Sequence, residues 1–364
     1  MPTPFFYYGH SGGDPDIRKL SGFTAPDPIM FLAAGEASTL LVSVMEYGRA
    51  LKESAGCAVE SPATLGTDKT PGAGMDAWVL AVLRKHAFTE IDVPPTFPLF
   101  IVRALEEAGI KVAVNKNGPA REGRGVKTEA EIGHIAAAQK AARAAMRVAE
   151  KAIKQAEPGR GGVLRLGDKV LTSARVRTLV RAELVRHDCI DFSDTIIAGG
   201  IQACDCHQRG DGPLRTGEFI VCDIFPKSLE TGYWGDMTRT FFNGKISREQ
   251  KRMYATVKAA HDAVLAALKA GVTGADMQKL TVDTLKAAGY ENGNNPDGTP
   301  FGYFHGVGHG IGLDVHESPG LNSTGGPLPE NAVVTVEPGL YYWKLGGVRI
   351  EDTVVITKDG AKVL

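Results

Sequence analysis

The sequence lacks several features that mark large classes of protein. Its 364 residues carry a formal net charge of −1, so it has no basic excess of the kind that binds nucleic acid or anionic membranes. No apolar run approaches the ~20 residues of a transmembrane helix. The opening residues, MPTPFFYYGHSGGDPDIRK, contain no basic segment followed by an apolar one, which argues against a secretory leader. We therefore expect a cytoplasmic protein that binds neither nucleic acid nor membrane.

Cysteine is also scarce. The chain has five, an odd number: Cys57, Cys189, Cys204, Cys206 and Cys222. So few cysteines in so long a chain are typical of reduced thiols in a cytosol rather than of a disulfide framework. What the chain does have is length and apolar content. At about 150 residues per domain its length suggests about two domains, and 43% of its residues are hydrophobic.

The N-terminal part alternates short strands and helices from about Asp16 to Val114, which predicts an α/β domain. The segment FPLFIVRALEEAGIKVAV is typical of a helix that stops at Gly109 and is followed by a strand. The polar, glycine-rich segment NGPAREGRG, residues 117–125, follows. We place the domain boundary there, which predicts domains over residues 1–125 and 126–364.

The second part shows two helices followed by strands, and then the same order again. Capping boxes start two of the helices, at Thr128 with Glu131 and at Ser247 with Gln250. Helices are expected over about 129–156, 173–187, 248–270 and 276–288. This order predicts an α+β domain with a mostly antiparallel sheet covered by helices, and it suggests an internal structural duplication.

Four acidic residues lie in or at the end of apolar strands, as in FIVCDIF, GYWGDMTRTFF, VVTVEPGLYYW and GVRIEDTVVIT. They are Asp223, Asp236, Glu337 and Glu351. Taken singly, each has an ordinary explanation: a strand end in solvent, a turn residue, or an ion pair with Arg349. Taken together they are harder to dismiss, because a buried carboxylate without a partner is costly.

Two divalent cations would neutralise all four carboxylates at once, about +4 against about −4. His309, in HGVGHGIGLDVHE, would add one nitrogen ligand. Carboxylates with a single imidazole suit manganese, cobalt, iron or zinc better than a thiolate set does. A thiolate site built from CDCH, residues 204–207, is the less favoured alternative. Cysteine is also a common small residue of protein cores, so its presence alone does not indicate a metal site.

These blocks, in this order, resemble those of the pita-bread metallopeptidases, in the branch of aminopeptidase P and proline dipeptidase (prolidase). HGVGHGIGLDVHE is the strongest local match, and GDMTRTF, VEPGLYY and VRIEDTVVIT resemble other blocks of the family. The resemblance covers roughly residues 126–364. It implies a C-terminal pita-bread fold with an internal pseudo-twofold, preceded by a smaller non-catalytic α/β domain of the creatinase N-terminal type. The separation of Asp223 from Asp236 is two residues longer than the pattern, which suggests a larger hairpin turn.

The resemblance also implies the metal ligands. Asp223 would bind one metal through both oxygens, and Asp236 and Glu351 would bridge two metals. His309 and Glu337 would complete the shell of the second metal. Two divalent ions per subunit are therefore expected, with manganese favoured and cobalt, zinc or iron as alternatives. A hydroxide bridging the metals would attack the substrate, and Glu337 would carry its proton.

Further residues match family positions around the substrate. His316 would hydrogen-bond the substrate carbonyl and the tetrahedral intermediate, while His305 and His207 would line the substrate site. For His305 and His316 an ordinary structural imidazole is the alternative. Arg349 would hold Glu351 in place. We expect the glycines around His309 to be there because side chains would crowd the metals and the substrate backbone.

The function implied is a metallo-exopeptidase that cleaves Xaa-Pro bonds in peptides with proline at the second position, assembled as a homodimer. A creatinase-like hydrolase, a methionine aminopeptidase and a non-enzymatic peptide-binding module on the same fold remain alternatives. All five ligands are present, which argues against the creatinase and binding-module readings. The substrate's length, dipeptide or longer, stays open.

Overall fold

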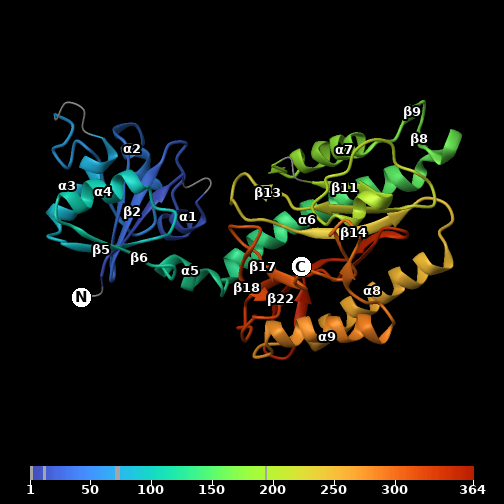
Figure 1. Ribbon diagram of the computed structural model, residues 1–364. Coiled ribbons are helices and arrows are strands. Elements are labelled where there is room, and N and C mark those ends of the chain that lie inside the picture. Colours follow the sequence, from blue (N-terminus) through green and yellow to red (C-terminus); the bar gives the residue numbers. More distant parts are fainter. Residues whose placement is uncertain (1–2, 11–13, 70–73, 193–194) are drawn as a thin grey trace. The chain divides into compact units, whose positions relative to one another are not determined.

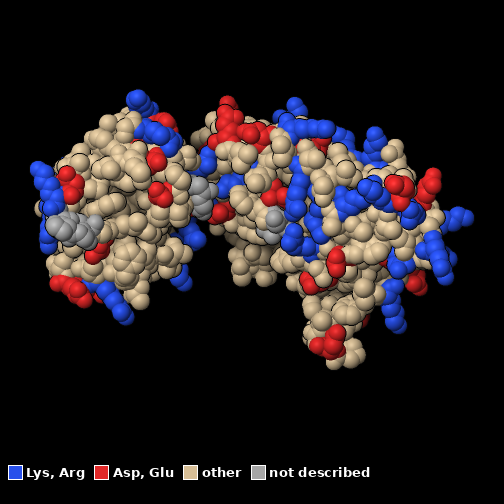
Figure 2. Space-filling model, turned by 90° about the horizontal axis from the view of Figure 1, so that it is seen from above, with Lys and Arg blue, Asp and Glu red and all other residues tan. Residues whose placement is uncertain are grey.

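The computed structural model describes residues 3–10, 14–69, 74–192 and 195–364. The chain divides into two compact units, Met1–Arg124 and Gly125–Leu364 (Figure 1). Over the described residues, no helix has both the length and the apolar character needed to cross a membrane. On the face in Figure 2 acidic and basic side chains are interspersed. The net charge is small because 41 basic residues nearly balance 42 acidic ones.

The first unit is built on a six-stranded mixed sheet with the order β4-β3-β2-β1-β5-β6. The pairs β1–β2 and β2–β3 are antiparallel, and β1–β5, β3–β4 and β5–β6 are parallel. The strands are β1 (Phe5–Gly9), β2 (Ile29–Ala34), β3 (Ala37–Leu41), β4 (Ala58–Glu60), β5 (Glu90–Val93) and β6 (Lys111–Val114). The helices are α1 (Pro15–Ser21), α2 (Val44–Glu53), α3 (Met75–Lys85), α4 (Leu99–Glu107) and α5 (Pro119–Arg124).

Both faces of this sheet are buried, and successive side chains of β1 pack on opposite faces. Phe6 packs in a cluster with residues of α3 and α4, whereas Phe5 and Tyr7 pack with residues of α1 and α2. Period-2 alternation places neighbours on opposite faces, so a run of apolar residues needs helices on both sides. The α/β prediction for this unit is confirmed. The glycine-rich segment 117–125 differs from a plain linker because it contains the short helix α5.

The second unit begins with two helices and a three-stranded antiparallel sheet, β11-β12-β14. Helix α6 starts at the predicted capping box of Thr128 and buries a row of alanines against α7 and β12. The bounds are α6 (Glu129–Gln155), α7 (Ser173–Val185), β11 (Ile196–Gly199), β12 (Phe219–Ile224) and β14 (Met237–Phe242). Smaller elements are β7 (Glu157–Pro158), η1 (Arg160–Gly162), β8 (Leu164–Leu166), β9 (Lys169–Val170), β10 (Cys189–Ile190), η2 (Gly200–Cys204) and β13 (Lys227–Ser228).

The same order of elements returns in the remainder of the unit. Helices α8 (Arg248–Ala267) and α9 (Gly274–Ala287) cover the five-stranded sheet β18-β17-β19-β22-β23. Its strands are β17 (Gly308–Gly310), β18 (Glu317–Leu321), β19 (Val333–Val336), β22 (Asp352–Ile356) and β23 (Ala361–Val363). The hairpins are β15 (Gly293–Asn294) with β16 (Pro300–Phe301), and β20 (Gly339–Tyr342) with β21 (Gly346–Arg349). The predicted antiparallel α+β domain with a repeated order is confirmed.

Candidate metal centre

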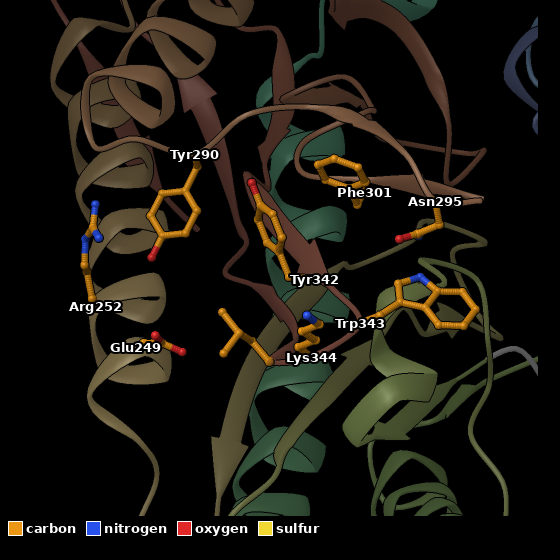
Figure 3. Close-up of a pocket in the computed structure, with 9 residues that line it drawn as sticks. Glu249, Arg252, Tyr290, Asn295, Phe301, Tyr342, Trp343 and Lys344 are labelled. Atoms are coloured by element: carbon orange, nitrogen blue, oxygen red, sulfur yellow. The ribbon is translucent and has the colours of Figure 1, made fainter. Parts of the chain in front are cut away.

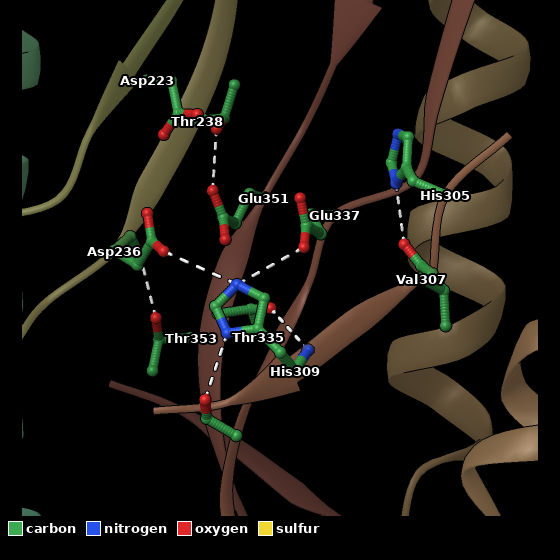
Figure 4. A network of polar contacts seen from close by, with 12 residues as sticks. Asp223, Asp236, Thr238, His305, Val307, His309, Thr335, Glu337, Glu351 and Thr353 are labelled. Carbon is green, nitrogen blue, oxygen red and sulfur yellow. Dashed lines mark hydrogen bonds and ion pairs between the residues drawn. The ribbon is translucent and has the colours of Figure 1, made fainter. Parts of the chain in front are cut away.

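The four predicted carboxylates and His309 converge on one point in the second unit, although they come from five separate segments (Figure 4). Asp223 lies in β12 and Asp236 directly precedes β14, so antiparallel pairing of these strands brings both to one end of the sheet. The others come from the second sheet and its hairpin: His309 from β17, Glu337 directly after β19, and Glu351 between β21 and β22.

Distances within the group are those of a metal-binding cluster. Ligand atoms of Asp236, His309 and Glu351 all lie within 4.8 Å of one another. The Nε2 atom of His309 lies 3.8 Å from Oδ2 of Asp236 and 3.5 Å from Oε1 of Glu337. These gaps exceed a hydrogen bond and leave room for a cation between the ligands, at the ~2.0–2.2 Å typical of such bonds.

Several of the carboxylate oxygens are buried without a hydrogen-bond partner. They are Oδ1 of Asp223, Oδ1 of Asp236 and Oε1 of Glu351. Burial raises the pKa of Glu337 to about 8. Burial, with the neighbouring carboxylates, also holds the pKa values of Asp236 and Glu351 well above the ordinary carboxylic range. Unpaired oxygens in a dry cluster are the donors that divalent cations bind, so these residues fit a metal centre.

His309 is oriented as a nitrogen ligand. Its Nδ1 lies 3.1 Å from the carbonyl oxygen of Gly310, which can only accept, so Nδ1 carries the proton. Nε2 then turns its lone pair toward the carboxylates. Burial, and after it the neighbouring His316, lowers the pKa of His309 to about 3, which keeps the ring neutral as metal binding requires.

Neighbouring side chains hold the carboxylates in place. Thr238 Oγ1 donates to Oε2 of Glu351 over 2.7 Å. Gln139 of α6 brackets the backbone of Asp236: its Oε1 accepts from the Asp236 N–H and its Nε2 donates to the carbonyl, both at 2.8 Å. Thr353 donates to the same carbonyl over 2.9 Å. The sequence analysis did not identify Gln139 or Thr353, because their contacts with Asp236 span 97 and 117 residues.

Arg349 differs from its predicted role. Its Nη2 pairs with Oδ2 of Asp223 at 2.7 Å, and its Nε lies 3.3 Å from Thr238 Oγ1. Thr238, rather than Arg349, makes the hydrogen bond to Glu351. That role came from the family resemblance; in the structure strand β21 ends at Arg349, before Glu351.

His305 lies in a polar chain behind the cluster. Its Nδ1 donates to the Gly306 carbonyl at 2.7 Å, so its Nε2 accepts from the hydroxyl of Tyr341 at 2.9 Å. That hydroxyl accepts in turn from Nη1 of Arg349 at 3.0 Å. Tyr341 is fully buried. Burial lowers the pKa of His305 to about 4, so the ring is neutral at pH 7.

The predicted histidines all border one cavity of about 1240 Å³ together with the cluster. The rings of His316 and His309 meet edge to face, with centroids 4.3 Å apart. His207 is more exposed, and its backbone N–H donates to Oδ1 of Asp205 at 3.2 Å. The structure thus brings together every residue that the sequence singled out, including His305.

The structure gives a different reason for two of the glycines around His309 than the predicted crowding of metals and substrate. A Cβ at Gly308 would lie 1.9 Å from the Thr335 carbonyl oxygen of β19, and one at Gly310 would lie 2.5 Å from the Ser318 carbonyl oxygen of β18. The neighbouring strands, rather than the metals or the substrate, therefore exclude a side chain at these two positions.

Cysteine takes no part in the group of ligands that the described residues bring together. Cys204 and Cys222 are buried, and burial raises the pKa of the Cys204 thiol to about 12. Such thiols resist the deprotonation that metal binding requires. The extra residues between Asp223 and Asp236 form a connection that includes the short strand β13 and pairs with β10.

The model of the metallopeptidase family M24 matches residues 134–358, which is more than half of the chain. The chain belongs to metallopeptidase family M24. Its metal chemistry is therefore that of a family of metal-dependent peptidases, and the cluster described above lies wholly inside the matched segment.

Individual relatives extend the M24 likeness over nearly the whole chain. An Xaa-Pro dipeptidase from Pyrococcus horikoshii is 29% identical over 355 residues, 96% of this chain and 90% of that protein. The solved prolidase from Pyrococcus furiosus has 25% identity and a TM-score of 0.80, covering 99% of this chain and 95% of that one. A dipeptidase structure from Mycobacterium ulcerans has 27% identity and a TM-score of 0.78, covering 99% and 90%. The pita-bread prediction is confirmed, with the N-terminal domain present.

Proposed function

We propose that this M24 enzyme is a dinuclear metallopeptidase that cleaves Xaa-Pro peptide bonds. The observation that carries the proposal is the set of buried carboxylate oxygens without hydrogen-bond partners, gathered around the neutral His309. The ligands would be Asp223, Asp236, His309, Glu337 and Glu351. Four carboxylates match the charge of two divalent ions better than that of one, and manganese is the ion we favour.

When bound, such metals would polarise the scissile carbonyl and lower the pKa of the attacking water toward neutrality. Glu337 accepts the proton from the attacking water and donates it to the leaving nitrogen. His316 donates a hydrogen bond to the carbonyl oxygen as it gains charge.

The preference for proline rests on the relatives and is compatible with the chemistry of the Xaa-Pro bond. An Xaa-Pro dipeptidase and a prolidase are among the proteins most similar to this chain. The amide nitrogen that precedes proline has no N–H, so the site must bind the scissile bond without a donor from that nitrogen. His305 and His316 both border the cavity that holds the cluster, which is where such a substrate would lie.

The test is a hydrolysis panel with metal-stripped protein reloaded separately with Mn²⁺, Co²⁺ and Zn²⁺. The substrates are Xaa-Pro dipeptides, Xaa-Pro tripeptides, methionyl peptides and creatine, and bound metal is counted by elemental analysis. We expect about two metal ions per chain and cleavage only before proline. Preference for methionyl peptides would favour a methionine aminopeptidase, turnover of creatine would favour a creatinase, and metal binding without any hydrolysis would indicate a binding module.

A further inference from the structure

A second cavity, of about 490 Å³, lies next to the catalytic cavity in the same unit. Its wall is a row of aromatic rings, with Tyr342 between Tyr290 and Phe301, and Trp343 lies at one end (Figure 3). The ring centroid of Tyr342 lies 5.7 Å from that of Tyr290 and 5.7 Å from that of Phe301. A cavity of this volume and lining is of the size and character that bind a small ligand or a peptide side chain.

The strand β20 separates the two cavities. Successive residues of a strand point to opposite faces. Tyr341 accordingly turns toward His305 and Arg349 in the catalytic cavity, while Tyr342 turns into the aromatic one. Trp343, directly after the strand, lines both cavities. The β15–β16 hairpin does the same on the other side, because Pro300 borders the catalytic cavity and Phe301 the aromatic one.

The catalytic cavity itself is larger than a dipeptide needs. At about 1240 Å³ it exceeds the ~300–1,000 Å³ of typical small-molecule sites, and its boundary reaches Trp343. A peptide that continues beyond the proline can therefore leave the metal cluster along this wall. We propose that the aromatic cavity binds an apolar or aromatic side chain on the downstream part of peptides longer than two residues.

The charges at the cavity suit the end of such a peptide. Arg252 and Lys344 line it with one acidic residue, Glu249, so its rim carries a net positive charge. The guanidinium of Arg252 lies 5.4 Å from the ring centroid of Tyr290, which fixes it beside the aromatic wall. A C-terminal carboxylate is favoured near these cations. The inference rests on the proposed function, since it assigns the substrate's downstream half.

The experiment uses the metal-loaded full chain and measures release of N-terminal alanine. The substrates are Ala-Pro and two matched series, Ala-Pro-Gly-Phe and Ala-Pro-Gly-Gly, each lengthened by one or two further glycines before the last residue. The readout is the ratio of kcat/KM for the Phe peptide to that for the Gly peptide of equal length. Because both values come from one preparation, partial loss of folded enzyme cancels.

We expect a ratio of about ten at one length or more, the effect of burying about half an aromatic side chain. It should fall toward one in Phe301→Ala or Trp343→Ala and persist in Phe192→Ala, which removes an exposed ring outside both cavities. A ratio near one at every length, or one retained in both cavity variants, would overturn the inference. The inference would also be overturned if the enzyme released alanine from Ala-Pro but from none of the longer peptides. Failure to release alanine from any of these peptides would instead contradict the proposed function.

Discussion

Glu337, the proposed proton carrier, lies mostly buried at the edge of the cluster. Its backbone N–H donates to the Val307 carbonyl at 2.8 Å, which fixes where the side chain starts, and its Oε1 lies 3.5 Å from His309. The carboxyl is thus held by the fold while both its oxygens remain directed at the cluster (Figure 4).

Replacing Glu337 by glutamine should lower kcat by about 10²–10⁴-fold, the usual contribution of a general acid–base group. The amide keeps the shape of the side chain but cannot accept the proton. Steady-state hydrolysis of an Xaa-Pro dipeptide, with bound metal measured in parallel, tests this. Glu330→Gln, at an exposed carboxylate of the same unit, is the control. Full activity in Glu337→Gln would exclude this residue as the proton carrier.

The pKa shifts at the cluster predict how the stability of the metal-free protein depends on pH. Glu337 has a folded pKa of about 8 against an ordinary 4.5, so between these values the folded protein holds a proton that the unfolded chain has lost. Stability from this group is present at low pH and is lost as pH rises through about 8. The lowered pKa values of His305 and His309, about 4 and about 3, act oppositely but only below about 6.5.

The window from about pH 6.5 to about 8 therefore isolates the carboxyl effect. With chelator present, we expect the urea midpoint to fall across this window, and in Glu337→Gln the decline should be smaller. With Mn²⁺ present the stabilisation should instead grow with pH, because the ligands must be deprotonated to bind metal. A metal-free midpoint that rises with pH in this window would show that the carboxyls ionise normally.

At the scale of the element, the strand β17 tolerates no side chain beside its histidine. A Cβ on Gly308 would overlap the Thr335 carbonyl at 1.9 Å, and that strand, β19, also leads into Glu337. Displacing β17 would move His309 away from the carboxylates. The spacing of the two strands is thus part of the geometry of the metal centre.

Gly308→Ala should destabilise the protein by about 1–3 kcal/mol or more, the range for forcing extra atoms into a packed site, and it should weaken metal binding. Gly133→Ala is the matched control. It lies exposed within α6 with open space around its Cβ position, so alanine should stabilise by about 0.5–1 kcal/mol. Urea unfolding and metal titration of both variants test the pair. Equal behaviour of the two would contradict the steric argument.

At the scale of the whole molecule, each unit has its own hydrophobic cores. The clusters around Phe6 and Tyr7 contain only residues of the first unit, and the clusters around α6 and α8 contain only residues of the second. The candidate ligands all belong to the second unit. Metal binding should therefore stabilise one unit more than the other.

Calorimetry of the intact chain should resolve this difference. At metal concentrations about 100 times the dissociation constant, the gain of about 2.7 kcal/mol should raise the transition of residues 125–364 by about 5–10 °C. The transition of residues 1–124 should stay in place. Hydrogen exchange by mass spectrometry assigns each transition to its residues. A single transition that shifts as a whole would show instead that the two units unfold together.

Much of this protein could be anticipated from local patterns. The capping boxes at Thr128 and Ser247 start α6 and α8 as predicted, because a cap depends on residues only three positions apart. Asp223 and Glu351 stood out because a carboxylate in an apolar strand is costly wherever the strand lies. The residues of the centre were therefore recognisable before their arrangement was.

The amino-acid sequence by itself determined the elements, their order and the identity of the charged groups, since these follow from side-chain chemistry and short-range periodicity. Only the tertiary structure decided which residues contact one another. Arg349 pairs with Asp223, and the backbone of β19 leaves no room for a side chain at Gly308. Such contacts depend on the register and the spacing of strands that are distant in the chain. The aromatic cavity beside Trp343 could not be predicted from the sequence either, because its walls come from segments that meet only in the folded protein.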